Sequence, residues 1–304
     1  MRILVIIFVV LVACAFVLVV NARWVDSQTR PAKARDGGQI LEAINIRANV
    51  RVEGRGQPIV LIHGFGAAMN WWDEITPELA NGHRVIRMDL IGHGGTEAPA
   101  AGYSIEKQAE LVSAILNKLG LDRITIVGHS MGGEVATALA EIRPDRIERM
   151  ILIDSPPTAG TTFTLATEAY LQPFLGEFLS NFRSDRIICR GLAQGFAPGF
   201  SIPEKFIADF KRLTYTAFRS AHEESIAYRK SKAPYERIAA LQPVPPLLAV
   251  FGTQDAIVPP AHAKLFERVR GASVAMIEGV GHSPMVESPV KVLALIKAFL
   301  QPES

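Results

Sequence analysis

The amino-acid sequence predicts an α/β fold in which a mostly parallel β-sheet is covered by helices on both faces. From about residue 40 onward, short runs rich in Val and Ile alternate with longer amphipathic stretches. The short runs are apolar at successive positions, whereas a strand with one face in water would alternate apolar and polar residues. Both faces of the sheet are therefore expected to be buried, as they are in α/β proteins.

Six segments fit such strands, and each is bounded by Gly, Asp or Pro: residues 58–62, 85–88, 124–127, 150–153, 247–251 and 274–277. Four amphipathic stretches fit helices: residues 105–119, 132–142, 261–269 and 290–300. The alternation of the two kinds of segment is typical of βαβ units.

The composition excludes several classes of protein. The chain has 304 residues, of which 49% are hydrophobic and 20% charged, and its formal net charge is +2. The apolar content excludes a disordered chain, and the lack of a basic excess excludes a nucleic-acid binder driven by counterion release. The two cysteines, Cys14 and Cys189, cannot make a disulfide framework or a four-ligand zinc site. The length fits one large domain with an insertion as well as two domains.

An unbroken run of 18 apolar residues occupies positions 3–20. As a helix rising about 1.5 Å per residue it would be roughly 27 Å long, close to the hydrocarbon thickness of a bilayer. The apolar core of a signal peptide is shorter, about 7 to 15 residues, so we interpret residues 1–22 as a retained single-pass membrane anchor. Two alternatives stay open: a signal peptide cleaved near Ala22, and a lipoprotein processed before Cys14. The polar residues 23–38 fit a linker.

Two sequence signals bear on which side of the membrane the following domain lies, and they disagree. Four cations follow the apolar run and only Arg2 precedes it, which by the positive-inside rule would place the following domain in the cytoplasm. A start of Met, one Arg and a long apolar stretch is instead typical of an export signal. We expect the domain on the extracytoplasmic side.

A G-x-S-x-G element lies at the junction between a predicted strand and a predicted helix. Residues 124–127 run directly into Gly128-His129-Ser130-Met131-Gly132. Glycines on both sides of Ser130 permit a tight turn that projects the serine oxygen above the sheet. Ser130 is therefore the candidate nucleophile.

A serine nucleophile needs a histidine base oriented by a carboxylate. His282 lies in a Gly-rich loop between the last predicted strand and the last predicted helix, and Asp255 follows the strand before that one. The chain order Ser, Asp, His is the one expected for this type of hydrolase. Asp154, which follows the strand at 150–153, is a reserve candidate for the acid.

Two backbone amides are candidates for an oxyanion hole. His63-Gly64-Phe65-Gly66 follows a strand, and Met131 follows the nucleophile, so the Phe65 and Met131 amides are expected to face the same oxygen. We interpret His63 as a structural residue that fixes this loop. The segment from Asp89 to Thr96 fits a structural turn.

These motifs together resemble the α/β-hydrolase fold family. HGFG at His63, the D-x-x-G-x-G turn at Asp89, GHSMGG at Ser130, GTQDAIVP at Asp255 and GHSPMVESP at His282 span about residues 40–302. The resemblance implies an eight-stranded, mostly parallel sheet, a catalytic triad of Ser130, Asp255 and His282, and usually no cofactor. The resembling epoxide hydrolases and haloalkane dehalogenases carry an Asp nucleophile, so Ser130 excludes them.

The resemblance also implies the domain organisation. Residues 39–304 would form one hydrolase domain, and residues 156–232, where the strand and helix rhythm breaks, would be a helical cap inserted after the sixth strand. Nine of the 15 phenylalanines fall in this segment. Phe174, Phe178 and Phe182 recur every four residues and so share a helix face, which more often packs a cap on its core than lines a substrate wall.

The expected function is hydrolysis of carboxylic esters of apolar acyl groups, as in an esterase or lipase. The expected partners are a small-molecule ester and, through the N-terminal helix, a membrane; no metal, cofactor or nucleic acid is expected. One alternative is a carbon–carbon bond hydrolase of ring-cleavage diketone acids, in which Arg183, Arg186 or Arg190 would hold the substrate carboxylate. A cofactor-free perhydrolase or haloperoxidase, and a catalytically silent, membrane-tethered binding module, are the others.

Overall fold

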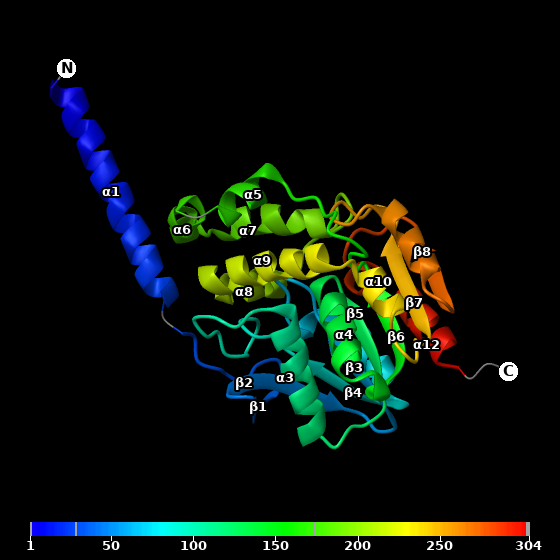
Figure 1. The fold of residues 1–304 in the computed structure, drawn as a ribbon. Helices are drawn as coiled ribbons and strands as arrows, with labels where there is room; N and C mark the ends of the chain where they lie inside the picture. The colour runs from blue at the N-terminus through cyan, green and yellow to red at the C-terminus, as the bar shows by residue number, and fades with distance from the viewer. Residues whose placement is uncertain (1, 28, 173, 302–304) are drawn as a thin grey trace.

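An eight-stranded sheet forms the centre of the molecule, with strand order β1-β2-β4-β3-β5-β6-β7-β8 (Figure 1). The computed structural model describes residues 2–27, 29–172 and 174–301. Strands β3 to β8 run parallel to one another, while β1 pairs with β2, and β2 with β4, in antiparallel fashion. The predicted α/β fold with a mostly parallel sheet is confirmed.

The strands are β1 Gln39–Ala43, β2 Ile46–Glu53, β3 Gln57–Ile62, β4 His83–Met88, β5 Ile124–His129, β6 Ile147–Ile153, β7 Leu247–Gly252 and β8 Ala272–Ile277. The α-helices are α1 Arg2–Ser27, α2 Thr76–Ala80, α3 Ile105–Lys118, α4 Met131–Ile142, α5 Leu165–Leu171, α6 Leu175–Leu179, α7 Asp185–Leu192, α8 Glu204–Arg212, α9 Tyr215–Ser231, α10 Pro234–Ala239, α11 Pro284–Glu287 and α12 Pro289–Leu300. The 3-10 helices are η1 Met69–Trp72, η2 Pro144–Arg146, η3 Ser180–Phe182, η4 Ala193–Gly195 and η5 Pro260–Arg268.

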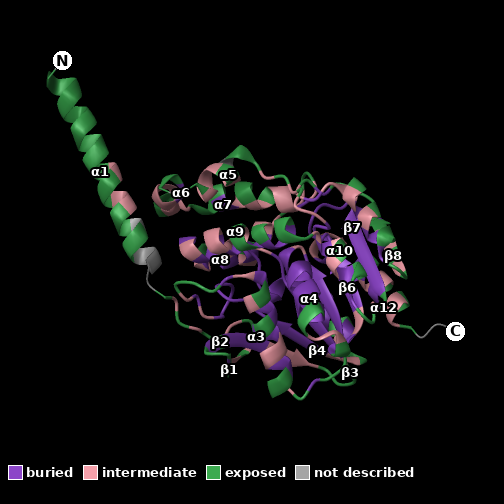
Figure 2. Ribbon diagram, viewed as in Figure 1, coloured by how far each residue is buried: buried purple, intermediate pink, exposed green. Residues whose placement is uncertain are grey.

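Both faces of the sheet are buried, as Figure 2 shows by the continuous burial of the central strands. In β3, Val60 and Ile62 belong to a core cluster shared with α3, α4 and η5. The intervening Ile59 and Leu61 belong to a second cluster shared with α2 and α12. Successive residues of one strand thus enter opposite layers, which explains why the strand sequences lack polar alternation.

The six predicted strands correspond to β3 to β8. The hairpin of β1 and β2 was not predicted, because its strands lack the run of successive apolar residues that identified the others. Its strand β2 alternates apolar and polar residues, and the apolar Ile46, Ala48 and Val50 are the ones that pack on the core. Ile44 and Asn45 join the two strands and both have positive φ, 48° and 61°. A two-residue turn of this kind matches the twist of an antiparallel hairpin.

The four predicted helical segments correspond to α3, α4, η5 and α12, and η5 is a 3-10 helix rather than an α-helix. Helices α5 to α9 lie between β6 and β7 and cover the carboxyl ends of the strands (Figure 1). They occupy most of the segment predicted as a cap.

The N-terminal helix α1 is long and apolar enough to cross a membrane over Arg2–Asn21, where the mean hydropathy is 3.7 and nothing is buried. It continues to Ser27, five residues into the segment expected to be a linker. Figure 1 shows α1 leaving the rest of the molecule beside α6. Here Arg23 pairs with Glu177 at 2.5 Å, and Asn181 Nδ2 donates to the Leu18 carbonyl oxygen at 3.3 Å.

Candidate active site

Ser130 occupies a strained turn between β5 and α4. Its φ of 50° and ψ of −123° are unfavourable for a residue with a side chain. The turn closes only because its neighbours are glycines: a Cβ on Gly128 would lie 2.5 Å from the Gly132 carbonyl oxygen, and one on Gly132 would lie 2.3 Å from that of Ile62. Sequence and geometry therefore agree on why glycines flank Ser130.

The structure brings Ser130 together with His282 and Asp255. His282 Nε2 lies 2.9 Å from Ser130 Oγ, and His282 Nδ1 lies 2.7 Å from Asp255 Oδ2. Because a carboxylate only accepts, Nδ1 carries the proton and Nε2 is free to accept one from the serine hydroxyl. The arrangement can activate a serine for attack on a carbonyl group.

Asp255 is held as a carboxylate despite its burial. Its other oxygen, Oδ1, accepts from the Ile257 and Val258 amides at 2.7 and 2.9 Å. Burial alone would raise its pKa, but the His282 imidazole and these amides outweigh that effect, so the pKa of Asp255 lies below its usual value.

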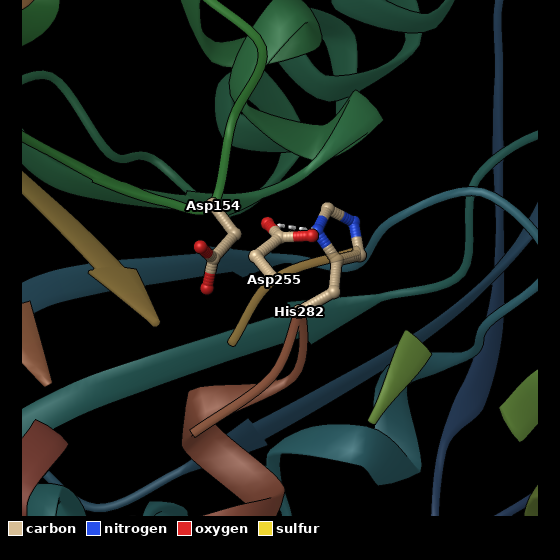
Figure 3. A group of neighbouring side chains, drawn as sticks. All are labelled: Asp154, Asp255 and His282. Carbon is tan, nitrogen blue, oxygen red and sulfur yellow. Dashed lines mark hydrogen bonds and ion pairs between the residues drawn. The ribbon is translucent and has the colours of Figure 1, made fainter. Parts of the chain in front are cut away.

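Asp154, the reserve candidate for the acid, lies on the side of Asp255 opposite the His282 imidazole (Figure 3). It directly follows β6 with a φ of 43°, is fully buried, and accepts from the Gly252 amide at 3.0 Å. Burial, and then the neighbouring Asp255, raise the pKa of Asp154 well above its usual value. Two adjacent buried carboxyls do not both ionise, and Asp255 has the better partners, so Asp154 holds the proton.

Ligand atoms of Asp154, Asp255 and His282 lie within 4.8 Å of one another, a spacing that a metal ion could bridge. The hydrogen bond between His282 Nδ1 and Asp255 already uses the nitrogen that would face such an ion. A protonated Asp154 is also a poor metal ligand, because metal binding requires deprotonated ligands. This donor set suits the triad arrangement better than a metal centre.

His63 fixes the loop after β3, as predicted. Its Nε2 accepts from the Leu90 amide at 3.0 Å, and its Nδ1 lies 2.8 Å from the Gly64 carbonyl oxygen. Burial lowers the pKa of His63 to about 4, which keeps the ring neutral. Asp89 organises the neighbouring turn by accepting from the Met69 and Gly95 amides at 2.8 Å each.

His129 also serves structure, since its Nε2 lies 2.7 Å from the His282 carbonyl oxygen. Burial and the neighbouring His282 lower the pKa of His129 to about 3. The contact pins the loop that carries His282, and it accounts for a histidine directly before the nucleophile.

A narrow pocket with a free volume of about 30 Å³ opens beside Ser130. Phe65 and Met131, whose amides were predicted to form an oxyanion hole, both line it, together with apolar groups of Pro156, Phe163 and Ile257. Met131 is the first residue of α4, where backbone N–H groups have no partner within the helix.

The pocket also holds an ion pair that sequence reasoning missed. Glu134 of α4 and Arg229 of α9 both line it, and Arg229 Nε lies 3.1 Å from Glu134 Oε1 with both side chains buried. Burial raises the pKa of Glu134 to about 7, opposed by Arg229. His222 lines the same pocket, and burial lowers its pKa to about 4. Glu134 was detectable as the one charge in the first two turns of an apolar helix.

The three arginines considered for the carbon–carbon bond hydrolase alternative do not line this pocket. Arg183 donates to the carbonyl oxygens of Ser180 and Leu213, at 3.2 and 2.7 Å. Arg186 and Arg190 are exposed on α7.

The phenylalanines of the cap divide into two groups. Phe206 is buried and stacks on Trp71 with ring centroids 4.2 Å apart, so it packs the cap on the core. Phe174 and Phe182 are instead 62% and 49% exposed. The expectation that their repeat packs on the core is wrong, because α6 lies at the outer end of the cap beside α1.

Comparison with known proteins gives a consistent picture. The model of the "Alpha/beta hydrolase family" matches residues 59–295. A protein of Mycobacterium tuberculosis that has no assigned function is 27% identical over 84% of this chain and 78% of its own length. A 2-hydroxymuconate semialdehyde hydrolase of a Pseudomonas species is 34% identical over 44% of this chain and 48% of its own length.

Solved structures agree with this. Est816, an N-acyl homoserine lactone degrading enzyme, is 26% identical with a TM-score of 0.68, over 86% of this chain and all of that one. A bacterial membrane phospholipase A is 22% identical with a TM-score of 0.66, over 99% of this chain and 98% of that one. At this identity the latter likeness shows the fold alone.

Proposed function

Because this chain belongs to the alpha/beta hydrolase family, we propose that it is a serine hydrolase that cleaves carboxylic esters of apolar acyl groups. The observation that carries the proposal is the continuous hydrogen-bonded series from Ser130 Oγ through His282 to Asp255, at 2.9 and 2.7 Å. Membership of the family supports a hydrolase. That the bond cleaved is a carboxylic ester is the part that we propose.

The reaction follows from the positions of these atoms. Ser130 Oγ attacks the ester carbonyl carbon while His282 Nε2 takes the hydroxyl proton, and Asp255 stabilises the resulting imidazolium. The Phe65 and Met131 amides donate to the oxyanion that forms. His282 then gives its proton to the departing alcohol, which leaves an acyl group on Ser130.

Water completes the cycle. His282 takes one proton from water as its oxygen attacks the acyl carbon, and returns that proton to Ser130 Oγ as the carboxylic acid is released. We place the carbonyl end of the acyl group in the pocket beside Ser130, where Phe65, Pro156, Phe163 and Ile257 offer apolar contacts.

The same pocket argues against a diketone acid as substrate. Such a substrate brings a carboxylate that needs an uncompensated cation, whereas Arg229 is already paired with the buried Glu134. Carbon–carbon bond hydrolysis therefore stays the second candidate, supported by the likeness to 2-hydroxymuconate semialdehyde hydrolase.

The test is a series of nitrophenyl esters of increasing acyl length, assayed on the full chain in detergent beside a dienoate ring-cleavage product. We expect ester hydrolysis, and covalent labelling of the Ser130 peptide by a fluorophosphonate, which reacts only with activated serines. Faster turnover of the dienoate than of every ester would favour the second candidate. A chain that does not react with the probe and hydrolyses neither the esters nor the dienoate would be a silent binding module.

The proposal includes α1 as a retained single-pass anchor, with the hydrolase domain on the extracytoplasmic side. Its contacts with the cap at Glu177 and Asn181 support retention, because cleavage near Ala22 would remove Leu18 from them. Mass spectrometry of the protein from the membrane fraction should recover residues 2–21. Protease added outside intact spheroplasts should digest the domain. An N-terminus at residue 23 or at a lipidated Cys14 would contradict the retained anchor. A domain protected from the protease would contradict the extracytoplasmic location.

A further inference from the structure

Apolar side chains are exposed mainly in one part of the hydrolase domain. Outside α1, nine large hydrophobic side chains of the described residues are exposed, and five of them lie between residues 165 and 187. These five, called the cap patch here, are Leu165, Phe174, Leu175, Phe182 and Ile187. The other four are dispersed: Ile44 lies in the β1–β2 turn, Ile142 on α4, Met276 on β8 and Val290 on α12. Single exposed hydrophobic residues are ordinary in soluble proteins, whereas a cluster marks an interaction surface.

The cap patch adjoins the apolar helix α1. Its residues belong to α5, α7 and the segment 174–182, and Figure 1 places α6 at the end of the cap nearest to α1. The Arg23 guanidinium lies 4.6 Å from the centre of the Phe174 ring and also pairs with Glu177. Arg23 thus joins the Phe174 end of the cap patch to α1.

One contact with α1 also indicates how deep the cap would lie relative to a bilayer. Asn181 donates to the carbonyl oxygen of Leu18, which lies inside the apolar run and three residues before Asn21. At about 1.5 Å per residue, Leu18 is roughly 4.5 Å along the helix from Asn21, where the apolar span ends. If α1 spans a bilayer, the segment around Asn181 and Phe182 must lie at the boundary between headgroups and acyl chains.

The charges around the cap patch suit such a boundary. Arg186 and Arg190 are exposed on α7, and the exposed Asp185 is paired with Lys211. Among the described residues of α5 to α7, the other exposed acidic side chain is Glu168 of α5, which forms no ion pair. Apolar side chains bordered by arginines are typical of surfaces that enter the interface of a membrane containing anionic lipids.

We propose that the cap patch is a membrane-docking surface that inserts into the lipid interface beside α1. The proposal rests on the anchor proposed above, and it extends that function to esters dissolved in the bilayer. Phe163 lines the pocket at Ser130, and Leu165, two residues further along the chain, is 84% exposed in the patch. The short segment between them places one end of the cap patch close in sequence to the pocket wall, and we take it as the side from which an ester dissolved in the bilayer would reach Ser130.

The test uses the full chain in vesicles of phosphatidylcholine and phosphatidylglycerol. Cysteine is introduced by Phe182→Cys or, as control, by Val290→Cys, in a chain that carries Cys14→Ala and Cys189→Ser, and is labelled with an environment-sensitive fluorophore. We expect lipids with a quencher on the acyl chain to quench the label at 182 and not at 290. Flotation of the vesicles reports separately on the anchor.

A second arm measures activity with Phe174→Ser combined with Phe182→Ser, against Val290→Ser as the matched control. Hydrolysis of a long-chain nitrophenyl ester dissolved in the vesicles should fall roughly tenfold in the patch variant alone, because apolar area available for insertion is lost. Hydrolysis of the water-soluble acetate ester should be unchanged in both.

The outcomes separate the two proposals. Flotation without quenching at 182 overturns the docking surface and leaves the anchor standing, whereas loss of flotation in the unsubstituted chain contradicts the anchor and the docking surface with it. Cross-linking of residue 182 between two copies, without quenching by lipid, would identify a second copy of the chain as the partner and overturn the lipid assignment. Equal loss of both activities in the patch variant would indicate a folding defect in place of lost docking, and would also count against the proposal.

Discussion

Replacing Ser130 by alanine is expected to reduce ester hydrolysis by about 10⁴-fold or more while the protein stays folded. Alanine removes the oxygen that forms the acyl-enzyme, and the remaining groups cannot form a covalent intermediate. Activity is read from the hydrolysis of a short nitrophenyl ester, and folding from thermal unfolding.

The strained backbone makes the folding readout informative. Ser130 has a φ of 50°, and alanine tolerates this region no better than serine, so the substitution leaves the strain in place. The hydroxyl at this position approaches the His282 imidazole at 2.9 Å, and its loss should cost little stability. A folded Ser130→Ala protein that keeps full activity would remove Ser130 from the mechanism and leave the proposed function without its central residue.

The sequence predicts the central sheet and the triad residues because their signals are local. A buried strand next to a Gly-x-Ser-x-Gly turn can be recognised from ten consecutive residues. The glycines are required because a Cβ at Gly128 or Gly132 would lie 2.5 Å or less from a backbone oxygen. The β1–β2 hairpin also has a local signal, the alternation of Ile46, Ala48 and Val50 with polar residues. A search for runs of successive apolar residues, which identifies strands buried on both faces, does not detect this hairpin.

Other features of the site depend on tertiary packing. Arg229 lies 95 residues from Glu134 in a helix that also contains Arg219, and nothing in the helix sequence distinguishes the buried arginine from the one that pairs with Glu223 near the surface. The exposure of Phe174 and Phe182 likewise follows from the position of α6 beside α1. Periodicity indicates that residues share a face, but not what that face contacts.

The second large effect is expected at Asp255, and the neighbouring Asp154 supplies its matched control. Asp255→Asn should lower ester hydrolysis by about 10⁴-fold, because an amide that accepts from the Ile257 and Val258 N–H groups presents its NH₂ to His282 and selects the wrong tautomer. Asp154→Asn should stay within roughly fivefold of the unsubstituted protein, since a neutral amide replaces a carboxyl that is already neutral. A loss at Asp154→Asn as large as that at Asp255→Asn would mean that the charge of Asp154 is required.

The protonated state of Asp154 also predicts how Asp154→Asn changes stability with pH. A carboxyl whose pKa is raised on folding contributes most stability below its unfolded pKa, near 3.9, and loses it as pH rises towards the folded value, by up to about 1.4 kcal/mol per pH unit. Asparagine does not titrate, so Asp154→Asn should become more stable relative to the unsubstituted protein as pH rises above about 4. Urea unfolding of both proteins at several pH values measures this difference in the free energy of unfolding. A difference that stays constant over this range, or that changes in the opposite direction, would place the proton elsewhere and leave Asp154 charged beside Asp255.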